Sequence, residues 1–215
     1  MVAGLLSTLK VIGEDTPEVP FTPESTCRPV GIYANSKYQG EQCLREVAAA
    51  TPMRYSVIRP PLVYGPGVRA NFLRLMRWVD RGYPLPFGAV RNRRSLIGVG
   101  NLCSLVQQVI AVRGTQSEDV LLASDGDDMS TPGLIRQLAA GMQRTPRLLP
   151  VPMKVLRWCG RLMGRSEEFA RLCGSLSVDI TLTCRLLDWK PPVSVNDAIA
   201  ETVEWYRVRG DSRAV

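Results

Sequence analysis

The sequence predicts an α/β protein with a doubly wound parallel sheet and a smaller, mainly helical lobe. Nearly continuous apolar runs are typical of strands that helices cover on both faces, as in a parallel sheet. Three such runs stand at 3–12, 55–64 and 120–124. Segments of helical composition separate them, and from Pro146 onward the chain consists of proline-bounded helical segments. Strands that alternate with helices, followed by a helical tail, predict this architecture.

Composition and helix-ending residues place the predicted helices. They span 33–50, 71–81, 101–112, 131–143, 153–163, 167–173, 181–187 and 195–207, and residues 94–99 are expected to be extended. Ser130 is expected to cap the helix 131–143, because its hydroxyl accepts a hydrogen bond from a free helix N–H. Pro60 and Pro61 are expected to end the second strand, because proline has no N–H to donate to a central sheet.

Composition argues against several classes of protein. The chain has 45% hydrophobic and 22% charged residues, as globular proteins do. No run approaches the roughly 18 consecutive apolar residues of a membrane span, and the first residues lack the pattern of a signal peptide, so we expect a cytoplasmic protein. The net charge of +7 comes from scattered basic residues that alternate with acids. This scatter argues against nucleic-acid binding, and a mild positive excess also fits an anionic small-molecule substrate.

The chain contains no histidine, which excludes Ser-His-Asp triads, Cys-His nucleophiles and HExxH metal sites within it. Cysteines stand at positions 27, 43, 103, 159, 173 and 184 without CxxC spacing, so neither a zinc ribbon nor a redox pair is expected. We predict no metal site. Any chemistry must use other acids and bases.

Tyr33 and Lys37 form a YxxxK pair near the start of a predicted helix. A spacing of four places both side chains on one helix face, so that the ammonium group lies near the phenol. A nearby positive charge stabilises a phenolate, which a tyrosine needs in order to act as a general base. The alternative is an exposed tyrosine beside a lysine on a solvated helix, and the pair alone does not decide between the two.

Ser7 and Thr8 stand where the first predicted strand meets the loop that follows it. A hydroxyl at the carboxyl end of a parallel strand points into the crevice where open α/β sheets bind ligands. Thr8 is therefore a candidate for a hydrogen bond to a reacting substrate oxygen. The alternative is a hydroxyl that merely ends the strand.

Four stretches follow one another along the chain: LLSTLKVIGE, YANSKYQGEQ, VIRPPLVYGPG and PFGAVRNRRSLIGVGNL. In this order they resemble the extended short-chain dehydrogenase/reductase family, and within it the NAD-dependent epimerases and dehydratases of the UDP-glucose 4-epimerase kind. The tail RLLDWKPPVSVNDAIAETVEWYR resembles the end of family members. The resemblance spans nearly the whole chain and implies the C-terminal part of a Rossmann-like sheet.

The resemblance also implies how the chain is divided. A partial Rossmann-like catalytic domain is expected at 1–145, with insertions from the substrate lobe near 66–100. A mainly helical substrate-binding lobe is expected at 146–215.

Roles for single residues follow from the same resemblance. It implies that Tyr33 is the general base, that Lys37 is its partner and binds the nicotinamide ribose, and that Thr8 completes the catalytic trio. The cofactor, NAD or NADP, is implied to contact Ser7, Tyr33, Lys37, Pro60, Pro61 and Val63. A UDP-sugar or related nucleotide sugar is implied to contact Asn71, Phe72, Phe87 and Arg94. Arg94 would meet the diphosphate, because the fork of guanidinium donors matches phosphate oxygens. Phe87 fits a core aromatic nearly as well.

The implied reaction moves a hydride from a sugar carbon to NAD while Tyr33 takes the hydroxyl proton, which leaves a transient ketosugar. Epimerisation, dehydration and reduction stay open as alternatives. The expected setting is the synthesis of surface polysaccharides such as O-antigen, and a homodimer is a further expectation.

The N-terminal part departs from the family pattern. Family members open with a GxxGxxG loop that receives the cofactor pyrophosphate, and these 215 residues contain no such motif. We therefore expect a chain that lacks this part and exposes one edge of its sheet. The alternative to an enzyme is a truncated, non-catalytic remnant or interaction subunit that does not bind NAD alone.

Overall fold

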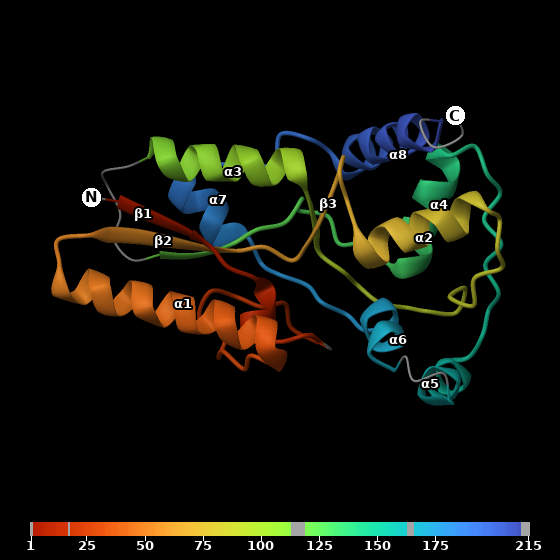
Figure 1. The fold of residues 1–215 in the computed structure, drawn as a ribbon, viewed down its shortest axis with the longest axis horizontal. Helices are drawn as coiled ribbons and strands as arrows, with labels where there is room; N and C mark the ends of the chain where they lie inside the picture. The colour runs from red at the N-terminus through yellow and green to blue at the C-terminus, as the bar shows by residue number, and fades with distance from the viewer. Residues whose placement is uncertain (1, 17, 113–118, 163–165, 212–215) are drawn as a thin grey trace.

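The computed structural model describes residues 2–16, 18–112, 119–162 and 166–211. The main sheet has three parallel strands, β1 (Val2–Leu6), β2 (Arg54–Arg59) and β5 (Asp119–Leu122), in the order β1-β2-β5. Helix α1 (Gly31–Ala50) covers one face of the sheet, and α3 (Val99–Ala111) and α7 (Thr181–Leu187) cover the other (Figure 1). Helices on both faces of a parallel sheet confirm the predicted α/β class.

A second lobe lies at the other end of the molecule (Figure 1). Between the two ends, a parallel pair is formed by β3 (Leu62–Tyr64) and β4 (Leu96–Gly98). The helices of this lobe are α2 (Ala70–Asp80), α4 (Thr131–Gly141), α5 (Met153–Leu162), α6 (Ser166–Cys173) and α8 (Val195–Asp211). In the described part of the chain, no helix has both the length and the apolar character that a bilayer crossing requires.

The first strand is shorter than the sequence predicts. The prediction of a strand over 3–12 is wrong beyond Leu6, since Leu9–Val11 form a 3-10 turn, η1. The hydroxyl of Thr8 accepts a hydrogen bond from the backbone N–H of Lys10 and caps this turn. Local capping of this kind competes with strand pairing. Leu9 is nevertheless buried, which explains why the apolar run in the sequence continues beyond the end of the strand.

Pro60 and Pro61 separate two strands that belong to different sheets, as expected for a strand end. The chain passes at this point from the main sheet into the second lobe. Ser130 caps α4 as predicted, since its Oγ accepts a hydrogen bond from the N–H of Gly133 at 3.1 Å. The predicted helices match the observed ones within a few residues at each end.

Residues from both sides of position 145 build the hydrophobic core of the second lobe. Met76 of α2, Leu138 of α4 and Ile199 of α8 belong to one buried cluster. A backbone bridge also joins Leu85 to Leu148. The division of the chain near residue 145 stays a prediction, and both of its parts contribute to this core.

A buried ion pair fixes α1 to the main sheet. Glu41 of α1 and Arg59 at the end of β2 are 0% and 1% exposed. Nε of Arg59 donates to Oε1 of Glu41 at 3.0 Å, and Nη2 donates to Oε2 at 2.5 Å. Burial lowers the pKa of Arg59, but the hydrogen bonds and charge of Glu41 outweigh burial and raise it overall. The hydroxyl of Ser7 also donates to Oε1 of Glu41, at 2.5 Å, so the pair joins α1 to the ends of two strands.

A second buried network surrounds Asp125, which follows β5. Its carboxylate accepts hydrogen bonds from the hydroxyl of Tyr64 at 2.8 Å, the N–H of Gly98 at 2.9 Å and the Nδ2 group of Asn101 at 2.7 Å. Burial and the charge of Asp125 raise the pKa of the Tyr64 hydroxyl, which therefore stays a donor. The network holds β3, β4 and the start of α3 against the end of β5.

Replacing Glu41 by alanine leaves the Arg59 guanidinium buried without its carboxylate. We expect the free energy of unfolding to fall by about 3–5 kcal/mol. Chemical denaturation followed by circular dichroism measures this change. Glu46→Ala, at an exposed position of the same helix, is the matched control. Equal denaturation midpoints for the two variants would show that the buried pair does not stabilise the fold.

Replacing Asp125 by alanine leaves the buried donors of Tyr64, Gly98 and Asn101 without their acceptor. We expect a loss of about 2–4 kcal/mol of stability. Asp127→Ala, two residues further on at an exposed position, should change stability by no more than about 0.5 kcal/mol. Thermal denaturation of both variants checks this prediction, and a loss of similar size in the control would contradict it.

Candidate functional site

A cavity of about 630 Å³ opens where the main sheet meets the second lobe. This volume is in the usual range for a site that binds a small molecule. Its wall contains part of η1, the turn between β2 and β3, the start of α2 and residues of β4, α4 and α6. Of the site residues predicted from the sequence, those that line the cavity are Thr8, Pro60, Pro61, Val63, Asn71, Phe72 and Arg94.

Thr8 and the two prolines lie side by side at the carboxyl end of the main sheet. The backbone N–H of Leu9 donates to the carbonyl oxygen of Pro60 at 2.9 Å, which joins the two loops. Ser7, next to Thr8, is committed to Glu41 through its hydroxyl. Of these two neighbours, Thr8 is the one that lines the cavity, and its hydroxyl accepts the hydrogen bond from the N–H of Lys10.

Tyr33 and Lys37 reach the same end of the sheet from α1. Nζ of Lys37 donates to the carbonyl oxygen of Leu6 at 3.1 Å, directly before Ser7 and Thr8. Tyr33 lies one turn earlier on the same helix face and is 58% exposed. Neither residue is part of the cavity wall, and the contact that links the pair to the neighbourhood of Thr8 is the hydrogen bond of Lys37 to Leu6.

The residues expected at the sugar nucleotide lie in different surroundings. Asn71 is exposed at the start of α2, and its Oδ1 accepts a hydrogen bond from Nη2 of Arg74 at 2.9 Å. Phe72 is stacked on Tyr64 with ring centroids 5.6 Å apart, and part of it reaches the cavity. Phe87 is 2% exposed, lies 6.2 Å from the ring of Phe169 and does not line the cavity. Phe87 thus packs in the core, and its assignment to the sugar nucleotide stays a prediction.

Arg94 is held by the second lobe. Its Nη1 donates to the carbonyl oxygens of Arg171 at 2.5 Å and Gly174 at 3.0 Å. Burial lowers the pKa of the Arg94 guanidinium, and the nearby charges of Asp15 and Glu14 oppose this effect. Arg94 thus contributes a fixed, partly desolvated positive charge to the cavity wall.

Sequence reasoning missed further charged residues of this wall. Nζ of Lys10 lies 2.8 Å from Oε1 of Glu14, and Nη2 of Arg171 lies 3.8 Å from the same oxygen. The hydrogen bond from Lys10 lowers the pKa of Glu14. Together with Arg69 and Arg74 these residues leave cations in excess among the described residues that line the cavity. The spacing of four between Lys10 and Glu14 was a signal in the sequence, whereas nothing local marks Arg171.

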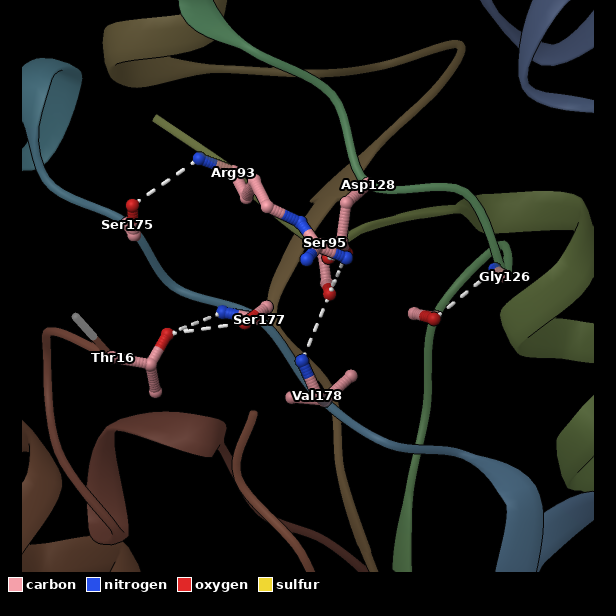
Figure 2. Close-up of polar contacts among 9 residues, drawn as sticks. Thr16, Arg93, Ser95, Gly126, Asp128, Ser175, Ser177 and Val178 are labelled. Carbon is pink, nitrogen blue, oxygen red and sulfur yellow. Dashed lines mark hydrogen bonds and ion pairs between the residues drawn. The ribbon is translucent and has the colours of Figure 1, made fainter. Parts of the chain in front are cut away.

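A set of polar contacts fixes the segment from Ser175 to Val178 (Figure 2). Leu176 of this segment lines the cavity. Ser95 donates from its Oγ to Oδ1 of Asp128 and accepts from the N–H of Val178 at 3.0 Å. On the other side, the N–H of Ser177 donates to Oγ1 of Thr16 at 2.7 Å (Figure 2). These bonds tie the loop after η1, the start of β4 and the chain after α6 into one wall.

Comparison with known proteins supports a shared fold. The structure superposes on that of UDP-glucuronic acid 4-epimerase from Bacillus cereus, solved in complex with NAD, with a TM-score of 0.76 at 16% identity. The match covers 97% of this chain and 62% of that one. At this identity the likeness concerns the fold alone.

Sequence relatives extend this likeness. The chain is 40% identical over 201 residues to UDP-glucose 4-epimerase from Vibrio cholerae. This match covers 93% of this chain and 61% of the relative. A second relative is N-acetyl-α-D-glucosaminyl-diphospho-ditrans,octacis-undecaprenol 4-epimerase from Escherichia coli O157:H7. It is 26% identical over 132 residues, and this match covers 60% of this chain and 40% of the relative. The chain thus spans less than two thirds of the length of either protein.

Residues 4–123 match the sequence profile described as the NAD dependent epimerase/dehydratase family. This stretch contains the strand-end hydroxyls, the YxxxK helix and most of the cavity wall. The chain belongs to the NAD dependent epimerase/dehydratase family.

Proposed function

We propose that this chain forms the catalytic and sugar-binding part of an NAD-dependent nucleotide-sugar epimerase or dehydratase. The observation that carries the proposal is the meeting of three features at one end of the main sheet. Lys37 is bonded to the last residue of β1, Thr8 follows two residues later, and a cavity of about 630 Å³ opens beside Thr8. This is the place where open α/β sheets bind their ligands.

The proposed roles of the catalytic residues are those that the family resemblance implies, and this geometry supports them. Tyr33 takes the proton from a sugar hydroxyl and returns it, with Lys37 one turn away to stabilise the phenolate. The Thr8 hydroxyl donates a hydrogen bond to the reacting oxygen. NAD, when bound, supplies the acceptor and donor of the hydride. Pro60, Pro61 and Val63 form the cavity wall on the side where its nicotinamide would lie.

A nucleoside diphosphate sugar is the substrate class that fits the cavity wall. A diphosphate is anionic, and cations exceed carboxylates among the described lining residues. We assign the diphosphate to the Arg94 side of the cavity, where the guanidinium is already fixed by two carbonyl oxygens. Asn71 and the exposed part of Phe72 lie where α2 begins and would contact the rest of the nucleotide sugar. UDP-glucose, named for the relative from Vibrio cholerae, is the first substrate to test.

The wider setting is part of the same proposal. We place the protein in the cytoplasm, in the synthesis of surface polysaccharides such as O-antigen. The relative from Escherichia coli O157:H7, named for a sugar carried on undecaprenol diphosphate, supports this setting. We also propose a homodimer, because α1 exposes apolar side chains such as Ile32 and Val47 that no other part of the described chain covers.

Replacing Tyr33 by phenylalanine tests the catalytic role. The change removes the proton acceptor and keeps the ring, so turnover of a nucleotide sugar should fall by about 10²–10⁴-fold. The measurement requires a protein that contains both this chain and the glycine-rich part of the family. Tyr83→Phe, at another exposed tyrosine, is the matched control and should keep full turnover. Normal turnover of Tyr33→Phe would remove Tyr33 from the mechanism.

Calorimetry on the 215-residue chain separates an enzyme part from an inert remnant. We expect UDP to bind through the cavity, and NAD to bind poorly, because these residues contain no GxxGxxG loop to hold its pyrophosphate. Thr8→Val and wild type should bind UDP alike, since Thr8 is assigned to the sugar end. Failure to bind UDP would favour the alternative that this chain is a non-catalytic remnant. Tight binding of NAD would refute the expectation that NAD binding requires the GxxGxxG loop.

A further inference from the structure

Helix α5 (Met153–Leu162) lies at the outer edge of the second lobe (Figure 1). Its inner face is anchored to the protein. Leu156 is buried, and a Cβ added at Gly160 would lie 3.2 Å from the Cβ of Phe169 on α6. The helix therefore packs closely on α6 through one side, which determines the side that it presents to solvent.

The solvent side of α5 carries an apolar stripe. Val155, Trp158 and Leu162 are 44%, 63% and 67% exposed. Their spacing of three and four residues places them on one helix face. Large exposed side chains in such a row cost free energy in water, and a tryptophan among them is unusual for a surface that stays solvated. A partner for this stripe is therefore expected.

A cationic stripe runs beside the apolar one. Lys154, Arg157 and Arg161 are exposed and have the same spacing along the helix. The sequence of α5, MKVLRWCGRL, contains no acidic residue. A row of cations next to a row containing tryptophan and leucine is the pattern of helices that lie in the interface of an anionic membrane.

The cavity does not account for this surface. None of the three apolar residues lines the cavity. The chemistry of the partner must therefore be deduced from the two stripes themselves.

We propose that α5 docks this protein on the surface of an anionic lipid bilayer. Trp158 and Leu162 insert at the boundary between headgroups and acyl chains, where tryptophan is favoured. Lys154, Arg157 and Arg161 contact lipid phosphates, and each basic residue near such a surface strengthens binding by about fivefold. The docking goes beyond the proposed catalytic function, since it concerns a separate surface and needs no cofactor.

Vesicle sedimentation tests the docking. The probes are vesicles of phosphatidylcholine alone and vesicles of phosphatidylcholine with an equal amount of phosphatidylglycerol. We expect the 215-residue chain to sediment with the mixed vesicles and to remain in solution with the neutral ones. Added salt should weaken the binding, because it screens the charges. Absence of binding to the mixed vesicles at low salt would overturn the proposal.

Two double variants and two controls locate the binding on α5. Trp158→Ser with Leu162→Ser, and separately Lys154→Glu with Arg157→Glu, should each lower the vesicle partition coefficient by at least about tenfold. The controls are Val208→Ser and Arg185→Glu, at exposed positions on α8 and α7, and both should bind as wild type does. Equal losses in variants and controls would overturn the assignment to α5.

Light scattering distinguishes a protein partner from a membrane. If the stripe binds a second copy of this chain, Trp158→Ser with Leu162→Ser turns a dimer into a monomer, and that result would overturn the proposal. An unchanged mass together with lost vesicle binding supports it. Circular dichroism confirms that the variants are folded, which their exposed positions lead us to expect.

Discussion

The buried pair of Glu41 and Arg59 is the interaction on which the candidate active site depends. Two opposite charges without solvent are stable only when their hydrogen bonds are satisfied, and this pair accepts a further bond from Ser7. Tyr33, Lys37 and Glu41 follow one another at intervals of four along α1, so they share one helix face. Fixing Glu41 inside the protein therefore fixes the rotation of the helix that presents the phenol and the ammonium group.

Exposure increases along this helix face towards the N-terminus of α1. Glu41 is fully buried, Lys37 is partly buried at the end of β1, and Tyr33 is mostly exposed beyond it. The part of α1 around Glu41 thus packs on the sheet, whereas the part around Tyr33 is exposed. Side chains on a helix fixed in this manner keep their position relative to the Thr8 loop, which the Leu9–Pro60 hydrogen bond orients, as the proposed role of Tyr33 requires.

Polar networks connect the second lobe to the end of the main sheet. Asp125 joins β3 and β4 to the end of β5, and the contacts of Ser95 and Ser177 join the segment after α6 to the cavity wall. These bonds connect residues that are far apart in sequence. Arg94 donates to the carbonyl oxygen of Arg171, and both arginines line the same cavity as Thr8, so that cations from distant segments face one ligand space.

The sequence by itself determined the alternation of strands and helices, the break at Pro60 and the cap at Ser130. These features depend on local hydrophobic periodicity, on the missing proline N–H and on a side chain bonding its own helix, all of which are written within a few residues. It also marked Tyr33, Lys37 and Thr8 as one candidate constellation, although the roles of these residues are proposals. Tertiary structure alone decided that Phe87 packs in the core, that Ser7 bonds Glu41, and that Lys10, Glu14 and Arg171 share a wall. Long-range packing decides such contacts, because two residues separated by more than 150 positions leave no periodic signal of their meeting.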